Sequence, residues 1–169
     1  MMSLHLWAVL IWSAIVGYFD VTARRIPNWL SLGAATVAVA VLAVQGESAM
    51  GGAPGSVLAA AGLATALTLP AYIGGLLGAG DVKLAVAMAL LTDFGTVVFS
   101  FIGGSLLAGF WAVLWLAARG SSRLAVWLHS MAWGRHLSAQ AGSTRPVPFG
   151  AALAVGFAAS LSFRASSGV

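Results

Sequence analysis

Long apolar runs dominate this sequence and limit what it can fold into. Six runs, at about residues 4–19, 29–44, 57–77, 82–91, 96–118 and 147–163, contain almost no charge. Only 7% of the 169 residues are charged, against about 25% in ordinary soluble domains. Because a membrane-spanning helix needs about 20 mostly apolar residues, we predict an all-α polytopic membrane protein. It has about six transmembrane helices in a single domain, residues 1–169.

The remaining composition excludes several classes of function. A formal charge of +4, spread along the chain, gives no basic patch for nucleic acid. The chain has no cysteine, which excludes disulfides, cysteine-ligated zinc and thiol catalysis. Residues 1–5 contain no Lys or Arg, and the first apolar run lacks a small-residue cleavage site, so we expect that run to remain as a membrane span.

Residues 78–83, with the sequence GAGDVK, stand between two apolar runs and hold the only lysine, Lys83. Placing a carboxylate within a transmembrane segment costs a few kcal/mol of free energy, so an intramembrane aspartate such as Asp81 indicates function by default. Gly78 and Gly80 allow a tight turn that presents Asp81 at the start of a helix. The alternative is that Asp81 only caps that helix at the membrane boundary.

The first apolar run ends at a second aspartate, Asp20, and a polar connection follows. It contains two arginines, Arg24 and Arg25, and then Pro27 and Asn28. Pro27 suits the first turn of the next helix, where its missing N–H would be unpaired anyway. The arginines are more typical of topology anchors than of substrate contacts.

The basic residues predict the orientation, because cytoplasmic loops are enriched in Lys and Arg. An outside N-terminus with six spans puts seven of the eight basic residues on the inner side and only Arg164 outside. Asp20 and Asp81 then both lie at the cytoplasmic face, at one depth, with Glu47 and Asp93 on the opposite face. The seven inner residues are Arg24, Arg25, Lys83, Arg119, Arg123, Arg135 and Arg145.

Two carboxylates that meet at the edge of a low-dielectric region do not both ionise readily. One ionised and one protonated aspartate meet the needs of an aspartyl protease, in which the first is the general base on a water and the second polarises the scissile carbonyl. This chemistry requires no metal and no cofactor. A proton-coupled transporter would use the same pair as a relay, so composition and topology leave both functions open.

Three stretches together resemble the type IV prepilin peptidases, a family of GxGD intramembrane aspartyl proteases. Residues 78–83 fit the extended GxGDxK form, and Asp20 with the following RRIPN at residues 24–28 resembles the first aspartate motif. Pro148 and Gly150, in PFG at residues 148–150, resemble the Pro-aromatic-Gly motif before the last span. The resemblance covers essentially the whole chain.

The resemblance implies an aspartic endopeptidase that removes the short basic leader from type IV pilin-like precursors at the cytoplasmic face of the bacterial inner membrane. Its catalytic pair would be Asp20 and Asp81. Its partners would be prepilins or pseudopilins with a hydrophobic N-terminal helix, and membrane lipid. The larger members have an N-terminal cytoplasmic region with a cysteine cluster and also N-methylate the product. No such region is expected before the first span here, and the chain has no cysteine. The chain therefore resembles the short, peptidase-only branch that serves Flp/Tad pili, and methyltransferase activity is not supported.

Other residues are expected to shape the site without chemistry of their own: Gly78, Gly80, Lys83, Pro27, Asn28, Pro148 and Gly150. Residues 119–146 form a predicted cytoplasmic loop with an interfacial amphipathic helix. His129 and His136, seven residues apart in that loop, are more typical of solvated side chains than of metal ligands. Three alternatives stay open: a small proton-coupled transporter, an inactive scaffold for pilus assembly, and an archaeal preflagellin peptidase.

Overall fold

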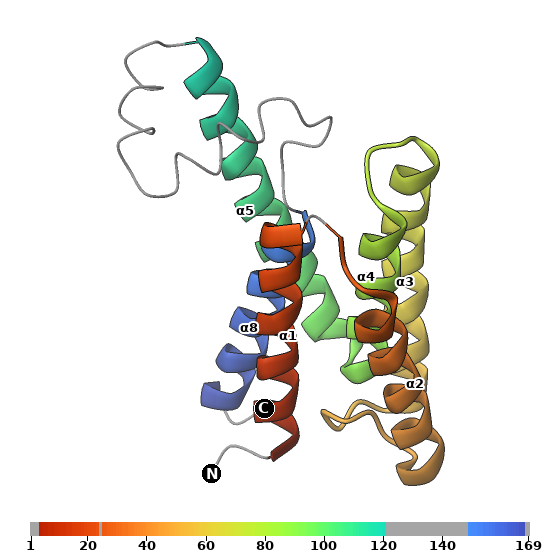
Figure 1. Ribbon diagram of the computed structural model, residues 1–169. Helices are drawn as coiled ribbons and strands as arrows, with labels where there is room; N and C mark the ends of the chain where they lie inside the picture. The colour runs from red at the N-terminus through yellow and green to blue at the C-terminus, as the bar shows by residue number, and fades with distance from the viewer. Residues whose placement is uncertain (1–3, 24, 121–148, 168–169) are drawn as a thin grey trace.

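The computed structural model describes residues 4–23, 25–120 and 149–167, with only the backbone for residues 115–120 (Figure 1). These residues form six α-helices and no strand. Successive helices run in alternating directions. The helices are α1 (Leu4–Ala23), α2 (Asn28–Gln45), α3 (Pro54–Ile73), α4 (Ala79–Leu91), α5 (Phe94–Gly120) and α8 (Phe149–Ser167). The loop predicted at residues 119–146, apart from the end of α5, lies outside the described residues, as does Pro148.

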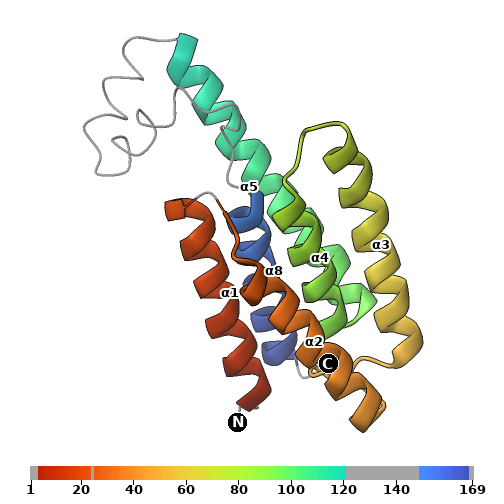
Figure 2. The ribbon, with the colours of Figure 1, turned by 45° about the vertical axis from the view of Figure 1, so that its right-hand side comes forward.

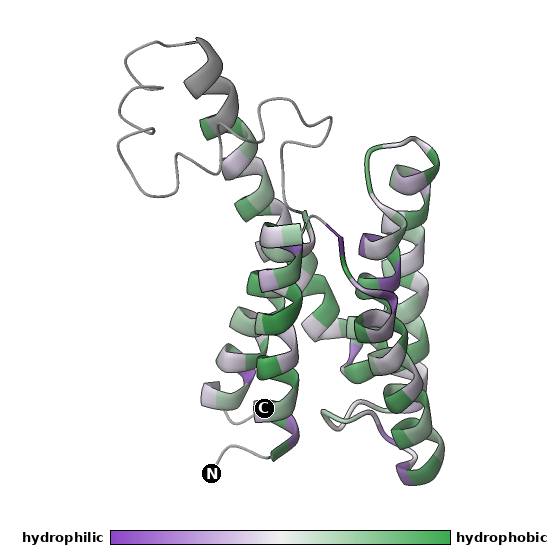
Figure 3. Ribbon diagram, viewed as in Figure 1, coloured by the Kyte–Doolittle hydropathy of each residue, from purple (hydrophilic) through white to green (hydrophobic). Residues whose placement is uncertain are grey.

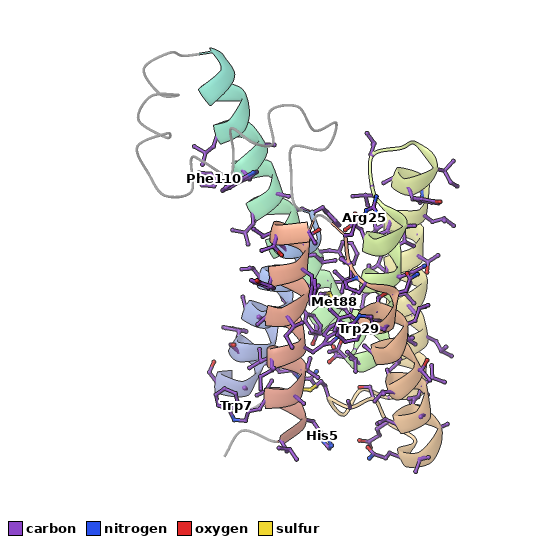
Figure 4. The ribbon with its side chains drawn as sticks, viewed as in Figure 1. His5, Trp7, Arg25, Trp29, Met88 and Phe110 are labelled. Atoms are coloured by element: carbon purple, nitrogen blue, oxygen red, sulfur yellow. The ribbon has the colours of Figure 1, made fainter. Side chains whose placement is uncertain are left out.

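The helices form two groups that stand side by side (Figures 1 and 2). In one group α8 packs against both α1 and α5, and in the other α4 packs against both α2 and α3. The groups meet where α3 contacts α5 and where α4 contacts α8. Met88 of α4 is buried and lies between the two groups (Figure 4). Since α1 and α4 belong to different groups, Asp20 and Asp81 lie on opposite sides of this boundary.

A stripe of buried residues along one face of α1 packs against α8. Its spacing of three and four residues places one face of α1 along the neighbouring helix. In the middle of the stripe the buried hydroxyl of Ser13 donates a hydrogen bond to the Ala154 carbonyl across 2.9 Å. This satisfies a polar group that would otherwise be costly to bury. The stripe consists of Leu6, Val9, Ser13, Val16 and Asp20.

Small residues let α5 and α8 approach closely. A Cβ added to Gly156 would lie 2.6 Å from the Gly104 nitrogen, and one added to Gly104 would lie 2.9 Å from the Leu153 Cα. Close packing at small residues such as Gly104 is typical of helix pairs in a membrane. The hydroxyls of Ser100 and Ser160 also meet across the pair at 3.0 Å.

Helix α4 is the exception in length. Its 13 residues give about 20 Å of helix, less than the roughly 30 Å of a hydrocarbon core. The other five described helices are long and apolar enough to cross a membrane. Six of its 13 residues are buried and only Ala79 is exposed, so neighbouring helices cover much of α4 and it does not need to match the lipid thickness. Its buried residues are Leu84, Ala85, Ala87, Met88, Ala89 and Leu91.

The described helices consist largely of apolar residues (Figure 3). Large hydrophobic side chains such as Val44, Leu106 and Phe163 are exposed on them. A lipid environment removes the cost that such exposure would carry in water. The all-α polytopic membrane fold predicted from the sequence is confirmed.

A polar cluster closes the end of the bundle where α4 passes into α5. Asp93 caps α5: its carboxylate accepts the Thr96 N–H at 3.0 Å and the Thr96 hydroxyl at 3.1 Å. Arg164, in the last turn of α8, forms an ion pair with Asp93. The start of α1 and the end of α8 lie at this same end of the bundle (Figure 1).

Candidate active site at the Asp20 and Asp81 helix ends

Asp20 is held by a helix far away in the sequence. It lies in the last turn of α1 and is 7% exposed, and its Oδ2 accepts the Ala151 N–H across 2.7 Å. Ala151 is the third residue of α8, so its N–H is one of the first-turn donors that have no partner inside the helix. A carboxylate at this point is also stabilised by the positive end of the helix dipole. Asp20 therefore caps α8 from another helix.

Gly150 is the residue that allows this approach. A Cβ added to Gly150 would lie 3.1 Å from both Cγ and Oδ2 of Asp20 and 3.0 Å from Cδ1 of Ile26. These separations are tighter than ordinary van der Waals contact, so a side chain here would displace the carboxylate or Ile26. The predicted role of Gly150 at the mouth of the site becomes a specific one: it makes room for Asp20.

Asp81 is the third residue of α4 and is half-buried. Its Oδ2 accepts the N–H of Gly78, the residue that precedes the helix, across 2.9 Å. The carboxylate is thereby folded back over the start of its own helix. The preceding turn does contain a glycine with positive φ, but this is Gly75 at 73°, whereas Gly78 has a φ of −85° that other residues adopt. Gly78 therefore takes part in this turn through its backbone N–H and not through a left-handed conformation.

Ile26 connects the surroundings of the two aspartates. It lies in the non-helical connection between α1 and α2, yet it is only 9% exposed and belongs to the hydrophobic core. Its Cβ is 3.5 Å from the position that a Gly80 Cβ would take, and its Cδ1 packs against Gly150. Gly80 precedes Asp81, and Gly150 contacts Asp20. One side chain thus lies between the start of α4 and the start of α8.

The connection between α1 and α2 crosses from one helix group to the other. The indole N–H of Trp12, well below Asp20 on α1, donates to the Leu30 carbonyl in the first turn of α2 at 3.0 Å. Figure 1 shows the connection descending from the end of α1 to the start of α2 between the two helix groups, and Figure 4 places Arg25 on it. Pro27 immediately precedes α2, one residue earlier than predicted.

Lys83 and Asn28 fasten the far end of this connection. The Lys83 ammonium donates a hydrogen bond to Asn28 Oδ1 across 3.0 Å, joining the first residue of α2 to the first turn and a half of α4. Residues two apart on a helix point to different sides, so Lys83 is directed toward α2 and Asp81 is directed elsewhere. Two of the predicted site-shaping residues are thus partners of each other.

Contacts join the described members of the predicted site in smaller sets: Asp20 with Gly150, Gly80 with Gly150 through Ile26, Asp81 with Gly78, and Lys83 with Asn28. Sequence reasoning missed Ile26 and Ala151. The signal for Ile26 was an apolar residue between Arg25 and Pro27 in an otherwise polar connection; Ala151 contributes only a backbone group and leaves no such signal. Within the described ranges no three His, Asp or Glu side chains come together to hold a metal ion.

Two carboxylates at neighbouring helix starts can act together on a water molecule. Asp20 lies deeper and already accepts one N–H, while Asp81 has more access to solvent. One such group can accept a proton from water while the other donates one to a carbonyl oxygen. The arrangement is therefore compatible with hydrolysis.

Comparison with known proteins places the sequence in a family. A family model described as the type IV leader peptidase family matches residues 7–113, which include Asp20 and Asp81 and end within α5. Searches of curated proteins and of solved structures found no match.

Proposed function

The chain belongs to the type IV leader peptidase family, and from this premise we propose that it is an aspartic endopeptidase acting on type IV pilin-like precursors. It removes the short basic leader that precedes a hydrophobic N-terminal helix. The observation that carries the proposal is that Asp20 and Asp81 each lie at a helix start, of α8 and of α4, and that Ile26 contacts both of these helix starts. Both aspartates lie within the matched residues.

In the proposed reaction the ionised aspartate removes a proton from a water molecule, whose oxygen attacks the scissile carbonyl carbon. The protonated aspartate hydrogen-bonds to the carbonyl oxygen and stabilises the charge that develops there. The tetrahedral intermediate then collapses, the C–N bond breaks, and the new amine takes a proton from the site. Asp20 and Asp81 supply both carboxyl groups, so the step requires no metal and no cofactor.

We further propose that this end of the bundle faces the cytoplasm of a bacterial inner membrane. Arg25 and Lys83 lie at the aspartate end, whereas Arg164 lies at the opposite end in its ion pair with Asp93. Positive charge is enriched on the cytoplasmic side of membrane proteins. A precursor held by its hydrophobic helix would present its leader junction at this level.

The proposed substrate is a Flp/Tad-type prepilin, cleaved without methylation of the new N-terminus. The support is the chain's resemblance to the short, peptidase-only branch and its lack of cysteine. The apolar runs at residues 29–44, 96–118 and 147–163 contain no Asp, Glu or Lys, which supports a one-sided site for hydrolysis over a charge-lined path through the membrane.

The test is reconstitution of the purified chain in vesicles with a prepilin that carries its leader. We expect one shortened product, and mass spectrometry with S-adenosylmethionine present should show an unmethylated N-terminus. An uncut precursor, together with proton flux in response to an imposed pH gradient, would contradict the peptidase and favour the transporter. A methylated product would contradict the peptidase-only assignment.

A further inference from the structure

We propose that Ile26 is a positioning residue: its side chain sets the spacing between the two helix ends that carry Asp20 and Asp81. The catalytic consequence of this role rests on the proposed peptidase function, whereas the spacing itself does not. Ile26 touches neither reacting group in the proposed chemistry. It acts through the glycines beside them.

The first support is the burial of Ile26 in an irregular segment. Connections between helices ordinarily lie on the surface, yet Ile26 is 9% exposed between Arg25, which is exposed, and Pro27. Its backbone is in no helix, so helix packing does not explain its burial. The burial of Ile26 therefore has to be explained by the contacts of its side chain.

The second support is what the side chain touches. Its Cβ and Cγ1 face Gly80, at 3.5 and 3.9 Å from the position of an added Cβ, and its Cδ1 faces Gly150 at 3.0 Å. Gly80 is on α4 and Gly150 is on α8. Both neighbours lack side chains, so Ile26 fills the space between the two helix starts.

The third support is that the connection is held on both sides of Ile26. On one side Asp20 is bonded to the Ala151 N–H, and on the other Asn28 is bonded to Lys83. Because the connection is held at both ends, the Ile26 side chain stays in place. A change in the volume of this side chain therefore changes the spacing of the two helix starts. Packed interiors respond to a change of even one methylene.

The volume of residue 26 can be changed in two steps. Ile26→Val deletes Cδ1 alone, the atom that faces Gly150, and leaves the atoms that face Gly80. Ile26→Ala also removes the contact to Gly80 except for Cβ. Leu91→Ala is the matched control, because Leu91 is 6% exposed and lies at the opposite end of α4. It removes comparable core packing without touching either glycine.

The spacing can be measured directly, because the chain has no native cysteine to remove. Spin labels at Tyr18→Cys and Ala79→Cys, both exposed, report the distance between the end of α1 and the start of α4. We expect Ile26→Ala to shift or broaden that distance by about 1.5 Å or more, the length of the bond removed. Ile26→Val should give a smaller change in the same direction, and Leu91→Ala should give none.

Kinetics on the unlabelled variants provide the second readout. We expect Ile26→Ala to lower kcat by about tenfold or more and Ile26→Val by a few-fold, because misplacing reacting groups by an ångström is costly. KM should stay within about twofold, since the proposed role of Ile26 is to place the reacting groups and not to bind substrate. Leu91→Ala should retain kcat once the folded fraction is matched.

Two results would overturn the proposal: an unchanged label distance in Ile26→Ala, or equal changes in Leu91→Ala. If the wild type cleaves and Asp20→Asn does not, while the Ile26 variants match the wild type, the peptidase stands and the spacer fails. If the wild type cleaves no precursor but the label distance follows the size of residue 26, the spacer stands and the proposed function fails.

Discussion

The Asp20 carboxylate accepts a hydrogen bond from the Ala151 N–H, joining two residues that are 131 positions apart in the sequence. This bond fixes a side chain at the end of α1 against the first turn of α8. The first turn of a helix offers N–H donors and a positive dipole end to an anion. One of the two candidate catalytic groups is therefore held in place by a helix that lies beyond the residues matched by the family model.

Gly150 is the position where this arrangement is most sensitive to an added methyl group. We expect Gly150→Ala to lower kcat by about tenfold or more, because its Cβ would lie 3.1 Å from the Asp20 carboxylate. Gly80→Ala is the matched control: its Cβ would lie 3.5 Å from Ile26, an ordinary contact, and alanine is the better helix former. Cleavage rates of the two variants measured side by side check this. Equal activity in both would contradict the close packing at Asp20.

The Lys83–Asn28 hydrogen bond predicts a measurable coupling between α2 and α4. The bond is solvent-exposed, so its net value is small, about 0.5–1 kcal/mol. We expect Lys83→Met and Asn28→Ala each to lower the unfolding temperature slightly, and the double variant to lower it by less than the sum. A double-mutant cycle of thermal unfolding measures this. Strict additivity would show that the two side chains do not interact.

The ion pair between Asp93 and Arg164 lies away from the candidate site, so we expect its removal to lower stability without lowering the cleavage rate. Asp93→Ala removes the cap of α5 and a partly exposed ion pair, together about 1–2 kcal/mol. Asp93→Asn keeps capping capacity and loses only the charge, so it should be less destabilised. Thermal unfolding is measured on both variants, and cleavage is then measured at a temperature below the melting temperature of each. A kcat that falls in either variant while the fold is intact would place this end of the bundle in the reaction.

Much of the fold could be predicted because helix formation in a membrane follows from local composition. The apolar run at residues 29–44 appears as α2, which is longer by one residue at each end. The end of α1, with Asp20, and the start of α4, with Asp81, lie toward the same end of the bundle, as alternating helices require (Figure 1). Boundaries were less accurate where glycines and a proline interrupt the pattern. The run at residues 57–77 ends as a helix at Ile73, because the turn begins at Gly74.

The internal construction of the candidate site was beyond prediction because it depends on contacts between distant segments. A pattern of apolar and polar residues cannot show that Asp20 meets a backbone N–H of α8, or that Ile26 lies between Gly80 and Gly150. The pairing of Lys83 with Asn28, 55 residues apart, is of the same kind. The residue types at the candidate site could be read from the sequence, whereas the contacts between them are seen only in the three-dimensional structure.

The most direct test of the account is leader cleavage by the wild type, Asp20→Asn and Asp81→Asn in membranes that contain equal amounts of each protein. Asparagine preserves the size of the side chain but cannot act as a carboxylate base or acid. Asp93→Asn is the control, since it removes the same charge at the other end of the bundle. We predict that the wild type and Asp93→Asn cleave the precursor and that each of the other two variants accumulates it uncut. Cleavage at the wild-type rate by Asp20→Asn or Asp81→Asn would contradict the two-aspartate mechanism.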